Sequence, residues 1–78
     1  MTKQILSPLP GIFYRKLAPD KPPYKKEGDS VDVGEVIGLI EVMKTFNEVK
    51  ADTAGKIVRF LAENEEEIMA GQPLVELA

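Results

Sequence analysis

The chain has 78 residues, no Cys and no His, and its 13 acidic and 10 basic residues give a net charge of −3. This length fits one small domain covering residues 1–78, which buries about 60% of the surface exposed by its unfolded chain and has little room for a deep active site. Without Cys and His, disulfides, thiol catalysis and the commonest metal ligands are excluded. We therefore expect no metal site and a protein that is not catalytic alone.

Charge and hydropathy also restrict partners and location. A nucleic-acid surface would show clustered Lys and Arg, which the acidic balance argues against. No apolar run approaches the ~20 residues that span a bilayer, and residues 1–4 lack the apolar segment of a signal peptide. We expect a cytoplasmic protein with neither nucleic acid nor membrane as a partner. The starting Met is compatible with a stand-alone protein and with an excised domain.

Short segments rich in Val, Ile, Leu and Phe, separated by turn residues, predict β-strands throughout. Prolines interrupt residues 17–24, which predicts a protruding loop because proline cannot donate to a sheet. Residues 63–70 are the one helix candidate, and we interpret them as a turn because they align with the turn-rich residues 27–33 in the repeat described below. The predicted strands are residues 5–7, 12–16, 36–42, 46–50, 56–61 and 73–77, and the core candidates are Phe13, Leu39, Ile40 and Ile57.

The two halves of the chain resemble each other. Residues 11–15 resemble residues 55–59 at an offset of 44, and residues 31–37 resemble residues 68–74 at an offset of 37. The first half therefore holds about seven extra residues, which fall in the proline-rich loop. Short strands and an internal repeat predict an all-β sandwich or flattened barrel with pseudo-twofold symmetry. This symmetry places the two chain ends at one end of the domain and residues 41–45 at the other.

One lysine stands out because of its neighbours. Lys44 follows Met43, a large apolar residue at a point where a turn favours Asn, Asp or Gly. A two-residue hairpin turn of the favoured type needs positive φ at both positions, and such strain tends to mark functional sites. We interpret Lys44 as the site of a covalent modification. A lysine amine is protonated in neutral water and does not attack an unactivated acid, so a separate enzyme must deliver an activated acyl group.

At these residues the sequence resembles the biotinyl domain of biotin carboxyl carrier proteins, in the biotinyl/lipoyl carrier superfamily. The family's pattern is Glu-Ala-Met-Lys-Met, with biotin on the lysine, and this chain departs from it at Val42 and Thr45. The likeness runs from about Ile5 to the end of the chain. The proline-rich loop at residues 17–24 stands where carriers of the bacterial acetyl-CoA carboxylase type have a protruding thumb.

The resemblance implies a barrel-sandwich hybrid of two four-stranded sheets that carries covalent biotin on Lys44. It implies a biotin protein ligase, a biotin carboxylase that carboxylates the ring, and a carboxyltransferase that passes the carboxyl group to acetyl-CoA or another acyl-CoA. The chain itself would supply reach rather than catalysis. The residues expected to be read by the ligase are Glu41, Val42, Met43 and Thr45, and the expected loop contacts to biotin are Pro19, Asp20 and Lys21.

Two other functions remain open on the sequence. A lipoyl carrier domain of an oxo-acid dehydrogenase complex has the same fold, but its usual motif is Asp-Lys, and here Met43 precedes the lysine. In an unmodified protein-interaction module, the hairpin would bind a partner and Lys44 would stay free. The proline-rich loop has an alternative interpretation as a mobile connector, and Glu41 and Glu48 as solvated strand residues.

Overall fold

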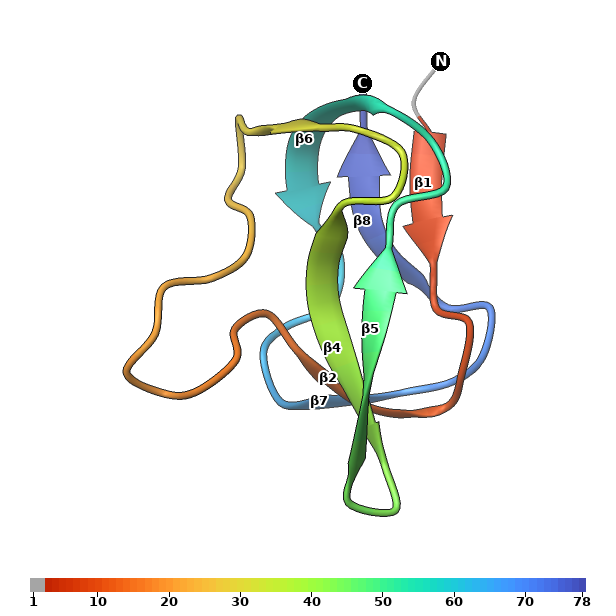
Figure 1. The fold of residues 1–78 in the computed structure, drawn as a ribbon. Coiled ribbons are helices and arrows are strands. Elements are labelled where there is room, and N and C mark those ends of the chain that lie inside the picture. The colour runs from red at the N-terminus through yellow and green to blue at the C-terminus, as the bar shows by residue number, and fades with distance from the viewer. Residues whose placement is uncertain (1–2) are drawn as a thin grey trace.

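A computed structural model describes residues 3–78, which form eight β-strands and no helix (Figure 1). The expected all-β fold is confirmed. The described residues therefore contain no helical segment that could span a bilayer. The strands are β1 (Lys3–Leu6), β2 (Gly11–Tyr14), β3 (Ser30–Val31), β4 (Val36–Val42), β5 (Thr45–Lys50), β6 (Gly55–Phe60), β7 (Glu66–Ile68) and β8 (Pro73–Leu77).

The strands form two antiparallel four-stranded sheets, with the orders β1-β8-β6-β3 and β5-β4-β2-β7. The sequence repeat relates the two sheets, because its offsets carry β2 onto β6, β3 onto β7, β4 onto β8 and β1 onto β5. Applying this exchange turns one strand order into the other. The predicted pseudo-twofold arrangement is therefore confirmed at the level of strand pairing.

Individual hydrogen bonds repeat as well. The backbone N–H of Gly28 donates to the carbonyl of Ile57 at 2.8 Å, and the N–H of Glu65 donates to the carbonyl of Phe13 at 2.6 Å. Gly28 and Glu65 are related by the offset of 37, and Phe13 and Ile57 by the offset of 44. The two halves thus share their turns as well as their strands.

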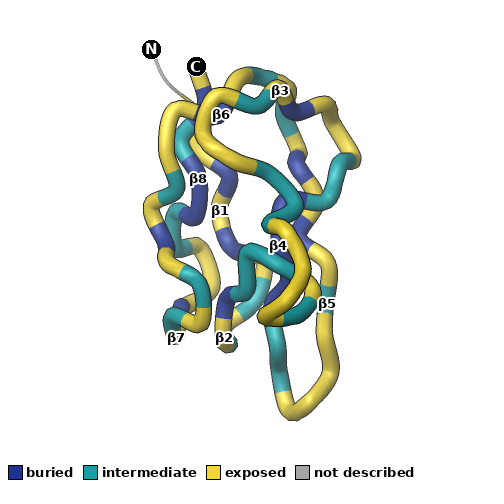
Figure 2. Tube along the Cα trace, turned by 90° about the vertical axis from the view of Figure 1, so that its left-hand side faces the viewer, coloured by how far each residue is buried: buried dark blue, intermediate teal, exposed yellow. Residues whose placement is uncertain are grey.

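The core lies between the two sheets, and each of the eight strands contributes at least one buried residue to it (Figure 2). Phe13, Ile40 and Ile57 belong to this core, as predicted. Leu39 is also buried, at 4% exposed, but it lies outside the core cluster. Because it neighbours Ile40 on β4, it points to the opposite face of its sheet, where it lines a shallow depression with residues of the loop.

The two segments interpreted as turn-rich do contain turns, at Gly28 and Glu65, but each also contains a strand that was not predicted. Segments 27–33 and 63–70 each contain a short strand, β3 and β7, which pair with β6 and β2. Each strand buries one apolar residue, Val31 or Ile68, so neither shows the alternation that marks a strand in a sequence. Their pairing depends on partners far along the chain.

The longest connection joins β2 to β3 and contains the proline-rich segment. The predicted strand 12–16 ends at Tyr14, because the chain turns into this loop. An isolated bridge between Lys16 and Pro23 closes its base, and the N–H of Tyr24 donates to the carbonyl of Arg15 at 2.9 Å. Figure 1 shows the loop projecting sideways from the sheets. The β4–β5 turn lies at the end of the molecule opposite β1's start and the C-terminus, as predicted.

Candidate functional site

The candidate site is the tip of the β4–β5 hairpin. Val42 pairs with Thr45, which leaves Met43 and Lys44 as a two-residue turn. Their φ angles are 50° and 67°, so the predicted positive φ at both positions is confirmed. A left-handed conformation costs a non-glycine residue about 1–2 kcal/mol. The strand ladder of β4, which is paired on both sides by β5 and β2, holds this strained turn in place.

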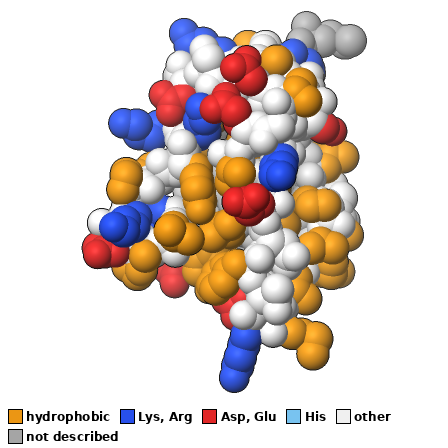
Figure 3. Space-filling model, viewed as in Figure 1, with side chains coloured by type: hydrophobic (Ala, Val, Ile, Leu, Met, Phe, Trp, Pro, Cys, Tyr) orange, Lys and Arg blue, Asp and Glu red, His pale blue; other side chains and the backbone are white. Residues whose placement is uncertain are grey.

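The tip presents a lysine amine and an apolar side chain to solvent. Met43 is 92% exposed, and Lys44 and Thr45 are also exposed. Within residues 3–78, the Lys44 amine makes no ion pair or hydrogen bond. A basic side chain extends beyond the rest of the molecule at this end, beside a hydrophobic one (Figure 3). An exposed primary amine of this kind fits the formation of an amide with a carboxylic acid.

The two predicted recognition residues on β4 are less exposed. Val42 is half-buried and packs against the hydrophobic core, so part of its role is structural. Glu41 is also half-buried, and its carboxylate accepts a hydrogen bond at 2.9 Å from the hydroxyl of Tyr14 on β2. Glu41 is therefore more than a solvated strand residue. Glu48, by contrast, is exposed and lies 4.0 Å from the Lys50 amine.

Tyr14 joins the hairpin to the neighbouring strand. Its ring lies 5.7 Å from the ring of Phe46 on β5, with the planes tilted by 60°. The pKa of the Tyr14 hydroxyl is raised above its usual value, chiefly because the hydrogen bond to Glu41 needs the phenol proton. Partial desolvation and the negative charges of Glu41 and Glu65 act in the same direction.

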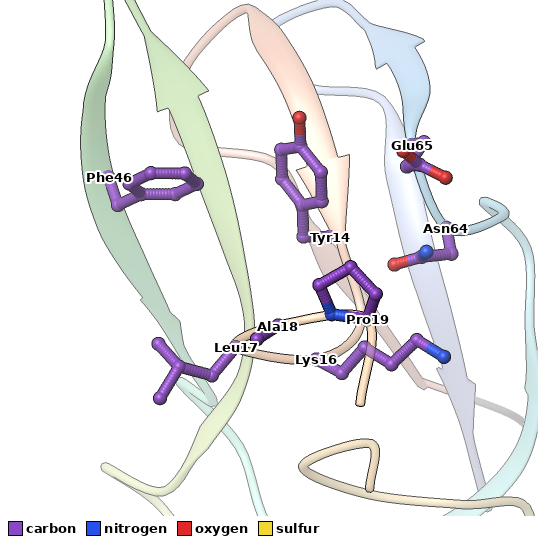
Figure 4. Close-up of a pocket in the computed structure, with 8 residues that line it drawn as sticks. All are labelled: Tyr14, Lys16, Leu17, Ala18, Pro19, Phe46, Asn64 and Glu65. Atoms are coloured by element: carbon purple, nitrogen blue, oxygen red, sulfur yellow. The ribbon is translucent and has the colours of Figure 1, made fainter. Parts of the chain in front are cut away.

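A cavity of about 250 Å³ lies beside this cluster, between the base of the loop and the outer surface of the sheet that contains β2 and β5 (Figure 4). Pro19 lines the cavity, whereas the exposed Asp20 and Lys21 do not. Residues of the loop and of the hairpin thus line the same cavity. The cavity is lined by Tyr14, Lys16, Leu17, Ala18, Pro19, Phe46, Asn64 and Glu65.

Sequence reasoning missed the aromatic residues of this site. The sequence places Tyr14 and Phe46 in predicted strands, and the strand periodicity also indicates which face Tyr14 shares. Residues two apart on a strand share a face, so Ile12 and Tyr14 lie together on the side opposite Phe13. Phe46, an apolar residue two positions after Lys44, is 55% exposed, so much of its ring is open to solvent beside Tyr14.

Two matched four-stranded sheets with a lysine at the tip of one hairpin are the features expected for the biotinyl and lipoyl carrier class. The model of a family described as "Biotin-requiring enzyme" matches residues 3–77. The chain belongs to this family. The resemblance inferred from the sequence is therefore confirmed.

Several similar proteins are biotin carboxyl carrier proteins of acetyl-CoA carboxylase. The one from Streptococcus pyogenes is 45% identical over 71 residues, which are 91% of this chain and 43% of that protein. A chloroplastic one from Arabidopsis thaliana is 40% identical over 72 residues, 92% of this chain and 28% of that protein. The chain thus spans less than half the length of these relatives.

A solved structure gives the same fold. The urea carboxylase of Kluyveromyces lactis matches all of this chain with a TM-score of 0.78 and 27% identity. The match covers 6% of that much longer chain. The two-sheet fold of this chain therefore also occurs as a small part of a large carboxylase.

Proposed function

We propose that this chain is a biotin carboxyl carrier domain with biotin joined through an amide to the amine of Lys44. The observation that carries the proposal is the exposed amine of Lys44 in a strained Met-Lys turn, at the far end from the C-terminus, in a chain of the biotin-requiring family. The ureido ring of biotin, once attached, would supply a nitrogen that accepts and releases a carboxyl group.

The residues around Lys44 would hold the biotinylated lysine side chain in an accessible position. The paired strands of the hairpin hold Lys44 away from the body, so a tethered group can reach other proteins without loss of the fold. Met43, which is almost fully exposed, offers an apolar contact for a biotin protein ligase. Glu41, Val42 and Thr45 complete the proposed recognition surface. Tethering raises the local concentration of the carried group, and the chain would contribute no catalytic step of its own.

The wider role is also a proposal. The names of the similar proteins support a role in which this chain interacts with a biotin carboxylase and a carboxyltransferase. The final acceptor of the carboxyl group would be acetyl-CoA or another acyl-CoA. Pro19 lines the cavity near the hairpin, which supports a contact between the loop and the carried ring, and Asp20 and Lys21 stay predicted contacts. A cytoplasmic location stays a prediction, since some similar proteins are bacterial and others are named chloroplastic.

The test is the intact mass of the protein after co-expression with a biotin ligase and excess biotin. We expect a gain of one biotin in the parent and none in Lys44→Arg, because arginine keeps the charge but has no amine that can form the amide. Lys50→Arg, a change of the same type on β5, is the matched control and should gain one biotin.

Three other results would each change this interpretation. A parent that gains no biotin would redirect the test to a lipoate ligase, and a gain there would establish a lipoyl carrier domain. A parent modified by neither ligase would be an unmodified interaction module. If Lys44→Arg failed to fold, the lysine would have a structural role that its exposure does not predict.

A further inference from the structure

Acidic and aromatic side chains meet beside the lysine on one face of the β5-β4-β2-β7 sheet. The register places Ile12 opposite Glu41 and Glu41 opposite Phe46. Directly paired residues of antiparallel strands share a face, and Tyr14, two positions after Ile12, lies on the same face. Hydrophobic side chains gather between the loop and the hairpin in the space-filling view (Figure 3). This face is the outer one, because Phe13 and Ile40 point into the core.

The carboxylate of Glu41 is held in a fixed position on this face. Its Oε1 accepts the hydrogen bond from the Tyr14 hydroxyl, and Oε2 makes no hydrogen bond or ion pair with residues 3–78. The packing of Tyr14 against Phe46 restricts the phenol in turn. Holding a side chain in its binding geometry before a partner arrives lowers the entropy cost of binding.

We infer that Tyr14 is a positioning residue for the modification of Lys44, holding the Glu41 carboxylate for an enzyme that approaches over this outer face. The inference rests on the proposed function. The enzyme would meet a fixed hydrogen-bond acceptor at Glu41, three residues from the lysine, flanked by the exposed side chains of Phe46 and Met43. Such a surface fits a biotin protein ligase that offers one donor or cation and an apolar contact.

The proposed positioning of Glu41 depends on the hydroxyl oxygen of Tyr14 alone, so one substitution can test it. Tyr14→Phe removes the hydroxyl but keeps the ring that packs against Phe46 and lines the cavity. Tyr24→Phe is the matched control, since Tyr24 is the chain's other tyrosine and its side chain makes no hydrogen bond within the described part of the chain.

The experiment is steady-state biotinylation of the purified full chain by a biotin protein ligase, with the carrier as the varied substrate. We expect Tyr14→Phe to raise KM by about threefold to tenfold, the effect of one hydrogen bond, with kcat unchanged. Tyr24→Phe should match the parent in both constants. An unchanged KM in Tyr14→Phe, with the parent labelled normally, would overturn the inference and leave the proposed function intact. A parent without label would overturn both.

A second set of variants tests whether Tyr14 acts through Glu41. In a Glu41→Ala background, Tyr14→Phe should cause no further rise in KM, because the carboxylate that it positions is absent. In a Glu41→Gln background, the amide oxygen can still accept the bond, so Tyr14→Phe should again raise KM. A full effect of Tyr14→Phe in the Glu41→Ala background would show that the hydroxyl acts on its own, which would overturn the positioning role.

Discussion

The two halves of the domain share one scaffold but differ around the lysine. In the first half, β4 runs through the Met43-Lys44 turn into β5, whereas its counterpart β8 ends at Leu77, next to the last residue of the described chain. The first half also carries the proline-rich loop, whose base lies beside the outer face of its sheet, while a short turn joins β6 to β7. The scaffold is therefore symmetric, and most of the candidate site belongs to one half. Equivalent positions in the other half provide internal controls.

We expect the largest difference in stability between alanine substitutions at the glycines that begin β2 and β6. A Cβ at Gly11 would overlap the carbonyl oxygen of Glu41 in the centre of a sheet, and the strand there cannot shift freely. A Cβ at Gly55 would lie 2.7 Å from the equivalent carbonyl of Ala78, an exposed residue just past β8. The N–H of Ala78 donates to the carbonyl of Lys56 at 2.8 Å, but Ala78 lacks the pairing with strands on both sides that holds Glu41. We expect Gly11→Ala to lower the free energy of unfolding by about 3 kcal/mol and Gly55→Ala by about 1 kcal/mol.

Urea denaturation of the two variants measures this difference. Equal losses would mean that Ala78 is held as rigidly as Glu41, and the expected difference between the two sites would be wrong.

A second pair concerns two equivalent turn residues with positive φ. The repeat relates Gly28 to Glu65, and both have positive φ, 92° and 67°. Only the first of the two is a glycine. A Cβ at Gly28 would meet nothing within 4 Å, so Gly28→Ala should lose only the strain energy, about 1 kcal/mol. Glu65→Gly should release similar strain and raise stability by about 1 kcal/mol. Thermal unfolding would show opposite shifts in Tm; shifts of the same sign would contradict a shared turn geometry.

Within residues 3–78, the second half contains no turn equivalent to the lysine turn, because β8 ends at Leu77. Met43→Gly should raise the free energy of unfolding by about 1 kcal/mol, since glycine adopts φ of 50° without strain. The same variant should be a poorer ligase substrate, because it lacks the exposed apolar side chain. Denaturation and labelling kinetics on one sample would test the two effects together. A variant that is more stable and equally well labelled would remove Met43 from the recognition surface.

The smallest expected effect is a change in how stability depends on pH, and it concerns two equivalent residues that differ in charge. Glu35 accepts the N–H of Asp32 at 2.7 Å, and Gln72, at the equivalent position, accepts the N–H of Met69 at 3.0 Å. The Asp32 N–H, and then the Lys25 ammonium at 2.9 Å, lower the pKa of Glu35 below its usual value of 4.5. Its stabilising contribution is therefore present above pH 4.5 and is lost as the pH falls further.

Glu35→Gln should accordingly remove part of the fall in Tm below pH 4.5, while Gln72, which does not titrate, contributes nothing to that fall. Melting curves of parent and variant across this range provide the measurement. Parallel curves would show that the Glu35 contacts do not persist in solution.

Sequence reasoning found the scaffold and the lysine but not the surroundings of the lysine. The long strands β4, β5 and β6 were predictable because each carries several apolar residues between clear turns. The hairpin turn was predictable because two-residue turns have a narrow choice of geometry. β3 and β7 were missed because two or three residues carry too little pattern. The bond between Tyr14 and Glu41 was missed because it joins residues 27 positions apart, and it depends on the register of two strands.

The central claim is that the hairpin tip presents one amine for modification, and peptide mapping of the labelled chain tests it most directly. The purified protein would be biotinylated with limiting ligase, digested, and sequenced by tandem mass spectrometry. The account predicts biotin on the peptide that contains Lys44 and on no other lysine. Biotin on another lysine, or spread over several, would contradict it.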